Sequence, residues 1–98
     1  MPAPATCSDI EIQRALASLT GWARKGDALV KTFAFPTFMA AIGFVNRVAA
    51  AAERMDHHPD LDVRYNKIGV ALSTHSSGGI TGNDVALARE MERLATSQ

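Results

Sequence analysis

Residues 53–75 read ERMDHHPDLDVRYNKIGVALSTH, and within them the pattern of the chain changes from helical to extended. Pro59 disfavours helical geometry at the residue before it, so a helix that arrives from the N-terminal side should stop near His57. Leu61–Tyr65 and Ile68–Ser73 are then expected to pair as a hairpin across the two residues between them. In the second arm every other residue is a large apolar one, which is typical of a strand with one buried face.

A long helix is predicted on the N-terminal side of this segment, from Thr37 to Met55. Its main apolar face is formed by Phe38, Ile42, Val45, Val48, Ala52 and Met55, and the surface is widened by Met39, Phe44 and Ala49–Ala52. No charged residue occurs between Lys31 and Arg47, although 20% of the whole chain is charged. A helix that is apolar on more than one side is covered by something besides its own sheet, and in so small a chain a second subunit is the natural cover.

Farther toward the N-terminus, another hairpin and another helix are predicted. Trp22–Phe35 contains a Lys-Gly-Asp turn in which the glycine supplies a positive φ. Ser8 and Glu11 form a capping box, which predicts a helix that starts there and ends at Thr20-Gly21. Residues 1–7 are small or proline-containing and are expected to form a loose tail.

The C-terminal side completes the predicted fold. Thr74–Gly82 is a polar, glycine-rich loop, and Thr81 and Asp84 form a second capping-box pair that opens a last helix over Asn83–Thr96. The element order is therefore α-ββ-α-ββ-α in a single domain over residues 1–98. Two hairpins and three helices fit an α+β fold, a four-stranded antiparallel sheet with three helices on one face.

The overall composition excludes several classes of function. The 98 residues include ten basic and ten acidic ones, whereas a nucleic-acid surface needs a basic stripe. No apolar run reaches the roughly 18–20 residues of a membrane span, and the N-terminus lacks a signal-peptide pattern. Cys7 is the single cysteine, so no internal disulfide can form and the cytoplasm is the expected compartment. Neither nucleic acid nor a membrane is therefore expected as a partner.

All three histidines of the chain, His57, His58 and His75, lie in the segment quoted above. Imidazole has an unperturbed pKa of about 6.5, so it both gives and takes protons near neutrality. Two imidazoles in one pocket can serve as acid and base in a single turnover, which suits a dehydration or an isomerisation. Glu53 lies four residues before His57, so on a helix these two side chains would be neighbours. A fourth strand beside the end of the long helix would bring the three rings together.

Other interpretations of the same residues stay open. A His-His pair at a helix end is often a cap or a surface feature, Asp84 has a sufficient role in capping the last helix, and Tyr65 is compatible with a simple strand aromatic. The potential zinc ligands are His57, His58, His75, Asp60 and Asp62. Consecutive histidines diverge, and the sequence has no His-x-x-x-His or Cys-x-x-Cys pair, so no metal site is expected.

The spacing of these residues resembles the signature of a known family. The pattern Glu53-x3-His57-His58-Pro59-x5-Tyr65-x9-His75-x8-Asp84 is similar to that of the pterin-4a-carbinolamine dehydratases. The resemblance implies that the chain dehydrates 4a-hydroxytetrahydropterin to quinonoid dihydropterin, and so recycles the pterin cofactor of the aromatic amino acid hydroxylases. It implies neither a metal nor a redox cofactor, because the pterin is the substrate.

The resemblance also implies a role for each matched residue. The catalytic histidines of the family fall on His57, His58 and His75, with acid/base work at the first and third and mainly binding at the second. The positions implied to contact substrate are Glu53, Asp56, Pro59, Leu61, Tyr65, Ser73, Thr74 and Asp84. Many members carry an aromatic residue, often tryptophan, in place of Leu61, and the leucine has no ring to stack on the pterin.

The family further implies assembly. Its members form dimers by pairing sheet edges and tetramers by packing their long helices, which would account for the stretch without charge. Some animal members double as transcriptional coactivators, and some relatives that lack the histidines act as assembly factors. The alternative function is therefore a non-enzymatic interaction or assembly module on the same fold. The three histidines discriminate between the two, because a pure binding module does not need them.

Overall fold

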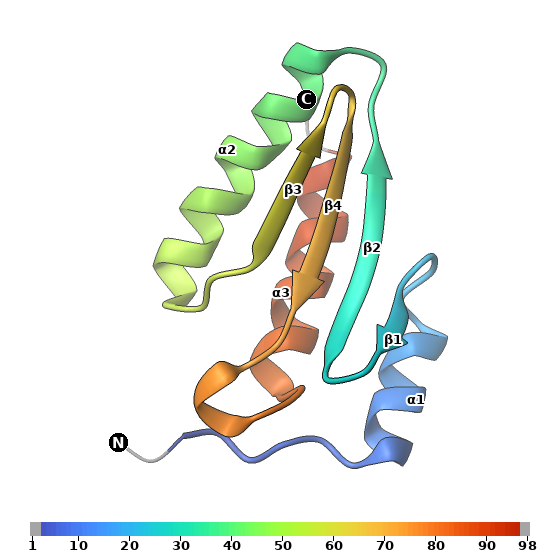
Figure 1. The fold of residues 1–98 in the computed structure, drawn as a ribbon, viewed down its shortest axis with the longest axis vertical. Helices are drawn as coiled ribbons and strands as arrows, with labels where there is room; N and C mark the ends of the chain where they lie inside the picture. The colour runs from blue at the N-terminus through green and yellow to red at the C-terminus, as the bar shows by residue number, and fades with distance from the viewer. Residues whose placement is uncertain (1–2, 97–98) are drawn as a thin grey trace.

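The structure, a computed structural model, describes residues 3–96 and has the predicted order of elements (Figure 1). Its helices and strands are α1 (Asp9–Ala17), β1 (Ala23–Lys25), β2 (Ala28–Ala34), α2 (Phe38–Met55), β3 (Asp60–Arg64), β4 (Lys67–Leu72), the short 3-10 helix η1 (His75–Ser77) and α3 (Gly82–Ala95). The α+β class is confirmed. Within residues 3–96, none of the helices is long and apolar enough to cross a membrane.

The four strands form one antiparallel sheet in the order β1-β2-β4-β3. In β4, Ile68, Val70 and Leu72 are buried, whereas Gly69 and Ala71 between them are half-buried and point to the opposite face. This period of two places the large side chains against the helices and the small ones on a face without helices. Figure 1 shows α3 behind the sheet and α2 beside β3, so the predicted placement of the helices on one face is confirmed.

The core lies between this face of the sheet and the helices. Phe44 of α2 is completely buried, with its ring centroid 4.8 Å from that of Phe33 and 5.0 Å from that of Phe35. Leu87 and Met91 of α3 are also completely buried. Phe44 was expected to widen the outer apolar surface of the long helix, and this expectation is wrong, because its ring fills the core of its own chain.

The long helix ends at Met55, the residue predicted for its end, and stops short of His57, near which Pro59 was expected to end it. Thr37 caps its start, since the Thr37 side chain accepts the backbone N–H of Ala40. At the other end Asp56 has left-handed geometry (φ 49°), and its N–H donates to the carbonyls of Ala52 and Glu53. A left-handed residue after the last turn stops a helix and satisfies its free carbonyls. The chain therefore leaves the helix at Asp56, before it reaches the histidines.

The hairpin of β3 and β4 turns one residue earlier than predicted. Arg64 pairs with Lys67, so the turn consists of Tyr65 and Asn66, and Tyr65 has a positive φ of 52°. Asn66 is fixed from outside the hairpin, because its side-chain amide donates to the carbonyl of Phe35 and its own carbonyl accepts the N–H of Phe35. These bonds hold Asn66 in the turn, as predicted, and Tyr65 rather than Lys67 is the other residue of the turn.

The N-terminal segment is attached to the body where the structure describes it. Thr6 forms an isolated bridge with Thr81, and the N–H of Cys7 donates to the carbonyl of Ile80 at 2.8 Å. The hydroxyl of Ser77 donates to the carbonyl of Pro4. The expectation of a loose tail over residues 1–7 is therefore corrected for residues 3–7, and residues 1–2 lie outside the described part.

Candidate functional site

His57 lies directly after the left-handed cap of α2 and points toward α3. Its backbone N–H donates to the carbonyl of Ala52, and its Nε2 lies 2.6 Å from Oδ1 of Asp84. The Asp84 side chain is completely buried, and the side chain of His57 is 10% exposed. Because α2 ends at Met55, the helical spacing on which the expected Glu53–His57 pair depended does not extend to His57, whose ring bonds to Asp84 while Glu53 bonds to His58.

Asp84 is held at its other oxygen by the start of α3 and by the loop before it. Its Oδ2 accepts the backbone N–H of Thr81 at 2.9 Å and the hydroxyl of Thr74 at 2.8 Å. The hydroxyls of Thr74 and Thr81 lie 2.7 Å apart. Burial of a carboxylate is costly unless its oxygens are hydrogen-bonded, and here both oxygens are. The predicted capping box at Thr81 is confirmed, and its acidic residue also binds His57.

His58 points away from this network. Its Nε2 lies 2.5 Å from Oε2 of Glu53, and the side chains are 58% and 76% exposed. The pair joins the last part of α2 to the segment after it and lies on the surface. Exposed ion pairs stabilise a fold by little, so this contact is more informative about where His58 points than about stability.

His75 reaches the same region from the far end of β4. It is exposed, and it begins η1 directly after Thr74, whose hydroxyl binds Asp84. The end of α2, η1 and the start of α3 all lie in the lower half of Figure 1, and the hydrogen bonds of Asp84 join these three parts of the chain. His57 is hydrogen-bonded to a buried carboxylate, whereas His75, the residue directly after Thr74, is exposed to solvent. Such a pair of differently placed imidazoles can act as acid and base.

Several predicted contact positions lie around this region. Pro59 is half-buried between His58 and β3, and Ser73 is half-buried directly after β4. Asp56 is exposed and serves as the left-handed cap of α2. Thr74 is buried, with its hydroxyl turned inward to Asp84, which the sequence alone did not indicate.

Tyr65 does not join the histidines. It forms the turn at the opposite end of the β3–β4 hairpin and is 71% exposed. The five residues of β3 separate it from the His57 end, which at about 3.3 Å per residue is roughly 16 Å. A tyrosine side chain is too short to span that distance within one chain.

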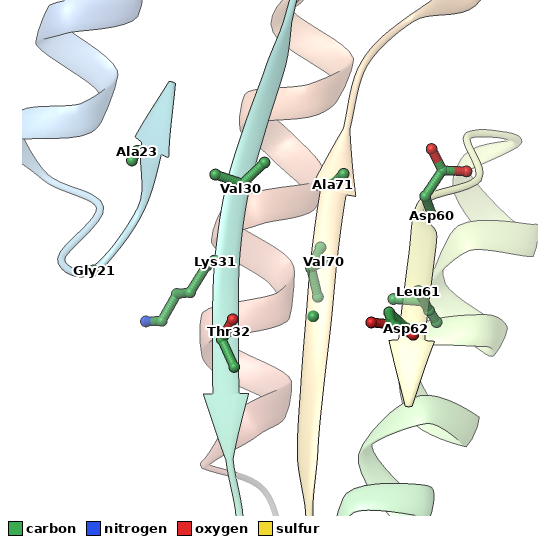
Figure 2. Close-up of a pocket in the computed structure, with 11 residues that line it drawn as sticks. Gly21, Ala23, Val30, Lys31, Thr32, Asp60, Leu61, Asp62, Val70 and Ala71 are labelled. Carbon is green, nitrogen blue, oxygen red and sulfur yellow. The ribbon is translucent and has the colours of Figure 1, made fainter. Parts of the chain in front are cut away.

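A separate hollow lies on the face of the sheet that has no helices (Figure 2). It has a volume of about 460 Å³, and Val30, Thr32 and Ala71 contribute to its surface. Asp60 and Leu61 line one side. Leu61 lines this hollow, whereas His57, Asp84 and the other histidines do not. The chemistry of the histidines makes their end of the molecule the better candidate for a reaction.

The titratable groups near the network support an acid/base site rather than a nucleophilic one. Burial raises the pKa of the Cys7 thiol, and the nearby carboxylates of Glu11 and Asp84 raise it further. A thiol with a raised pKa carries little thiolate at neutral pH and is a poor nucleophile. Among residues 3–96, no three His, Cys, Asp or Glu side chains are grouped so that they could hold a metal ion.

Comparison with known proteins matches the chain to one family. The family model described as pterin 4 alpha carbinolamine dehydratase matches residues 5–94. A protein of Thermomicrobium roseum named "Putative pterin-4-alpha-carbinolamine dehydratase" is 49% identical over 92 residues, which cover 94% of this chain and 99% of the relative. A protein of the same name from Nocardia farcinica is 50% identical over 88 residues, which cover 90% and 93%.

Two solved structures are similar in fold. The transcriptional coactivator/pterin dehydratase from Brucella melitensis has a TM-score of 0.89 and 37% identity, with 92% of this chain and 98% of that chain covered. A pterin dehydratase-like protein identified as a RuBisCO assembly factor in the alpha-carboxysome has a TM-score of 0.64 and 24% identity, with 79% and 89% covered. At that identity the second likeness concerns the fold alone.

Proposed function

Because the chain belongs to the pterin-4-alpha-carbinolamine dehydratase family, we propose that it removes water from 4a-hydroxytetrahydropterin and releases quinonoid dihydropterin. The observation that carries the proposal is the buried pair of His57 and Asp84, with His75 directly after Thr74, whose hydroxyl binds the same carboxylate. A reaction that only moves protons and breaks one C–O bond needs an acid and a base, and these two imidazoles supply them.

The elimination balances without any oxidant or reductant. The bond between C4a and its hydroxyl oxygen breaks, and that oxygen leaves as water after it takes a proton from one imidazole. A ring N–H of the pterin gives its proton to the other imidazole, and the freed electron pair forms the new C=N bond. We assign these two transfers to His57 and His75 without deciding which is acid and which is base. Each positioned group contributes roughly 10²–10⁴-fold to the rate.

The surroundings of the three histidines suggest which of them transfer protons and which binds substrate. Asp84 holds the His57 ring in place through Nε2, so the orientation of this imidazole is fixed before substrate arrives. His75 is exposed and can meet a substrate that arrives from solvent. The exposed pair of His58 and Glu53 lies outside the network, which suits a role in binding rather than in proton transfer.

We place this activity in pterin recycling for an aromatic amino acid hydroxylase, and we propose the cytoplasm as its compartment. The family signature supports the first proposal, and the single cysteine agrees with the second. The proposed chemistry calls for no metal and no redox cofactor, because the substrate itself supplies the electron pair.

The absorbance of freshly made 4a-hydroxytetrahydropterin, followed with and without protein, tests the proposal. His75→Ala should lower kcat by about 10²-fold, while circular dichroism stays as in the wild type because His75 is exposed. His58→Ala is the comparison, and it should raise KM more than it lowers kcat. A His75→Ala variant that turns over at the wild-type rate would refute the mechanism.

A second candidate function is an interaction or assembly module. One observation favours it: Met39 and Phe38 at the start of α2 are 74% and 45% exposed, although both are apolar. Neighbouring exposed apolar side chains at the start of a helix suit a surface that binds another protein. If the wild-type protein gave no acceleration over buffer in the same assay, this second function would replace the first.

A further inference from the structure

The hydrogen bonds around Asp84 fix the position of each proton in the network. The backbone N–H of Thr81 and the hydroxyl of Thr74 both donate to Asp84 Oδ2. The single hydroxyl proton of Thr74 is therefore committed to the carboxylate, so in the contact between the two hydroxyls it is Thr81 that donates. The Thr81 oxygen in turn accepts the backbone N–H of Asn83.

The same reasoning fixes the tautomer of His57. A carboxylate accepts hydrogen bonds and donates none, so Nε2 of His57 carries a proton where it faces Asp84. The lone pair of the neutral ring is then on Nδ1. Among residues 3–96, the one side-chain nitrogen or oxygen that is buried without a hydrogen-bond partner is Nε1 of Trp22. Nδ1 of His57 makes no hydrogen bond in that part of the chain and is not sealed off either, so it reaches solvent.

From this network we infer that Thr74 is a positioning residue for the reaction, and that Nδ1 is the atom of His57 that exchanges a proton with the substrate. The Thr74 hydroxyl holds the Asp84 carboxylate so that Oδ1 faces His57, and Asp84 in turn keeps the proton on Nε2. This inference rests on the proposed function. It also replaces the expected substrate contact at Thr74, because that side chain is 6% exposed and its proton is already used.

Loss of the Thr74 hydroxyl would release two groups together. Asp84 Oδ2 would keep the N–H of Thr81 alone, and the hydroxyl of Thr81 would lose its acceptor. A carboxylate held at fewer points turns more freely, and the ring that depends on it loses its fixed tautomer. The effect should therefore fall on kcat, since substrate binding at the surface does not involve Thr74.

Two variants of Thr74 test the inference. Thr74→Val keeps the shape of the side chain and removes the hydroxyl, whereas Thr74→Ser keeps the hydroxyl. We expect Thr74→Val to lower kcat by about tenfold with little change in KM, which is the effect of losing one hydrogen bond of ordinary strength. Thr74→Ser should restore kcat to within about threefold of the wild type. The matched control is Thr32→Val on the open face of the sheet, which should leave kcat unchanged.

A second readout, the tautomer of His57 by long-range ¹H–¹⁵N correlation at alkaline pH, does not depend on activity. We expect the wild type and Thr74→Ser to carry the proton on Nε2, and Thr74→Val to show a mixture. A wild-type ring protonated on Nδ1, or a Thr74→Val variant with wild-type kcat and tautomer, would overturn the inference. If Thr74→Val does not fold, the wild-type tautomer and the rate of Thr74→Ser still decide. If the wild type has no dehydratase activity, the proposed function fails, while the tautomers still report whether Thr74 positions the ring.

Discussion

Asp84 serves the fold and the candidate site with one side chain. One oxygen caps α3 through the N–H of Thr81, and the other binds His57. Capping alone is a sufficient reason for an acidic residue at this position, but it does not require complete burial. The ring of His57 at Oδ1 and the hydroxyl of Thr74 at Oδ2 cover the carboxylate beyond what the cap needs, and the side chain is completely buried.

Asp84→Asn separates these two roles. The amide oxygen can still accept from Thr81 and Thr74, whereas the amide NH₂ would face His57 and force the proton of the ring onto Nδ1. We expect kcat to fall by about 10²–10⁴-fold, in line with the loss of a positioned acid or base. The free energy of unfolding should change by only about 1–2 kcal/mol, since the cap is kept. Steady-state kinetics and urea unfolding measure both, and a wild-type kcat in Asp84→Asn would show that the tautomer is unimportant.

At the scale of the elements, local signals predicted the fold well and the site only in part. Capping boxes and the alternation in β4 act between residues close in sequence, so the order of helices and strands could be read from them. The pairing of His57 with Asp84 joins residues far apart in the chain, and it depends on the left-handed turn at Asp56, which no local pattern indicated. Tyr65 was grouped with the histidines by spacing, but a hairpin places its turn far from its ends.

The contribution of the start of α1 to the stability of the fold should depend on pH. The carboxylate of Glu11 accepts the backbone N–H of Ser8, and this bond, followed by the contact with the Ser8 hydroxyl, lowers the pKa of Glu11 in the folded state. A group whose pKa is lower in the folded state stabilises the fold above its unfolded value and loses that contribution as the pH falls through the folded value. The wild type should therefore be more stable than Glu11→Gln at neutral pH, and the difference should shrink on acidification.

Urea unfolding of the two proteins from neutral to acidic pH measures this difference. The control is Asp27→Asn in the turn between β1 and β2, where the carboxylate makes no hydrogen bond within the described residues. The difference for Asp27→Asn should depend less on pH than that for Glu11→Gln. A difference for Glu11→Gln that stays constant down to the lowest pH would show that the capping box does not depend on the charge.

At the scale of the whole molecule, α2 is apolar on two sides. Its inner side packs into the core through Phe44 and Val48, which are completely buried. Its outer side carries Met39, 74% exposed, and Phe38, 45% exposed, in the stretch without charged residues. Exposed methionine and phenylalanine close together are unfavourable in water, so we propose that the outer side is covered by the same helix of other copies of the chain.

Met39→Glu tests this proposal, because a charge on the exposed outer side opposes packing between copies without entering the core. We expect sedimentation at micromolar concentration to show a wild-type oligomer and a shift of Met39→Glu toward the monomer. Ile10→Glu is the matched control, since Ile10 is 60% exposed on α1 and should leave the oligomer intact. A charge at Phe44 would be uninformative, because burying it would unfold the chain itself. A wild-type monomer at micromolar concentration would leave the outer side of α2 without a partner of its own kind and refute the proposal.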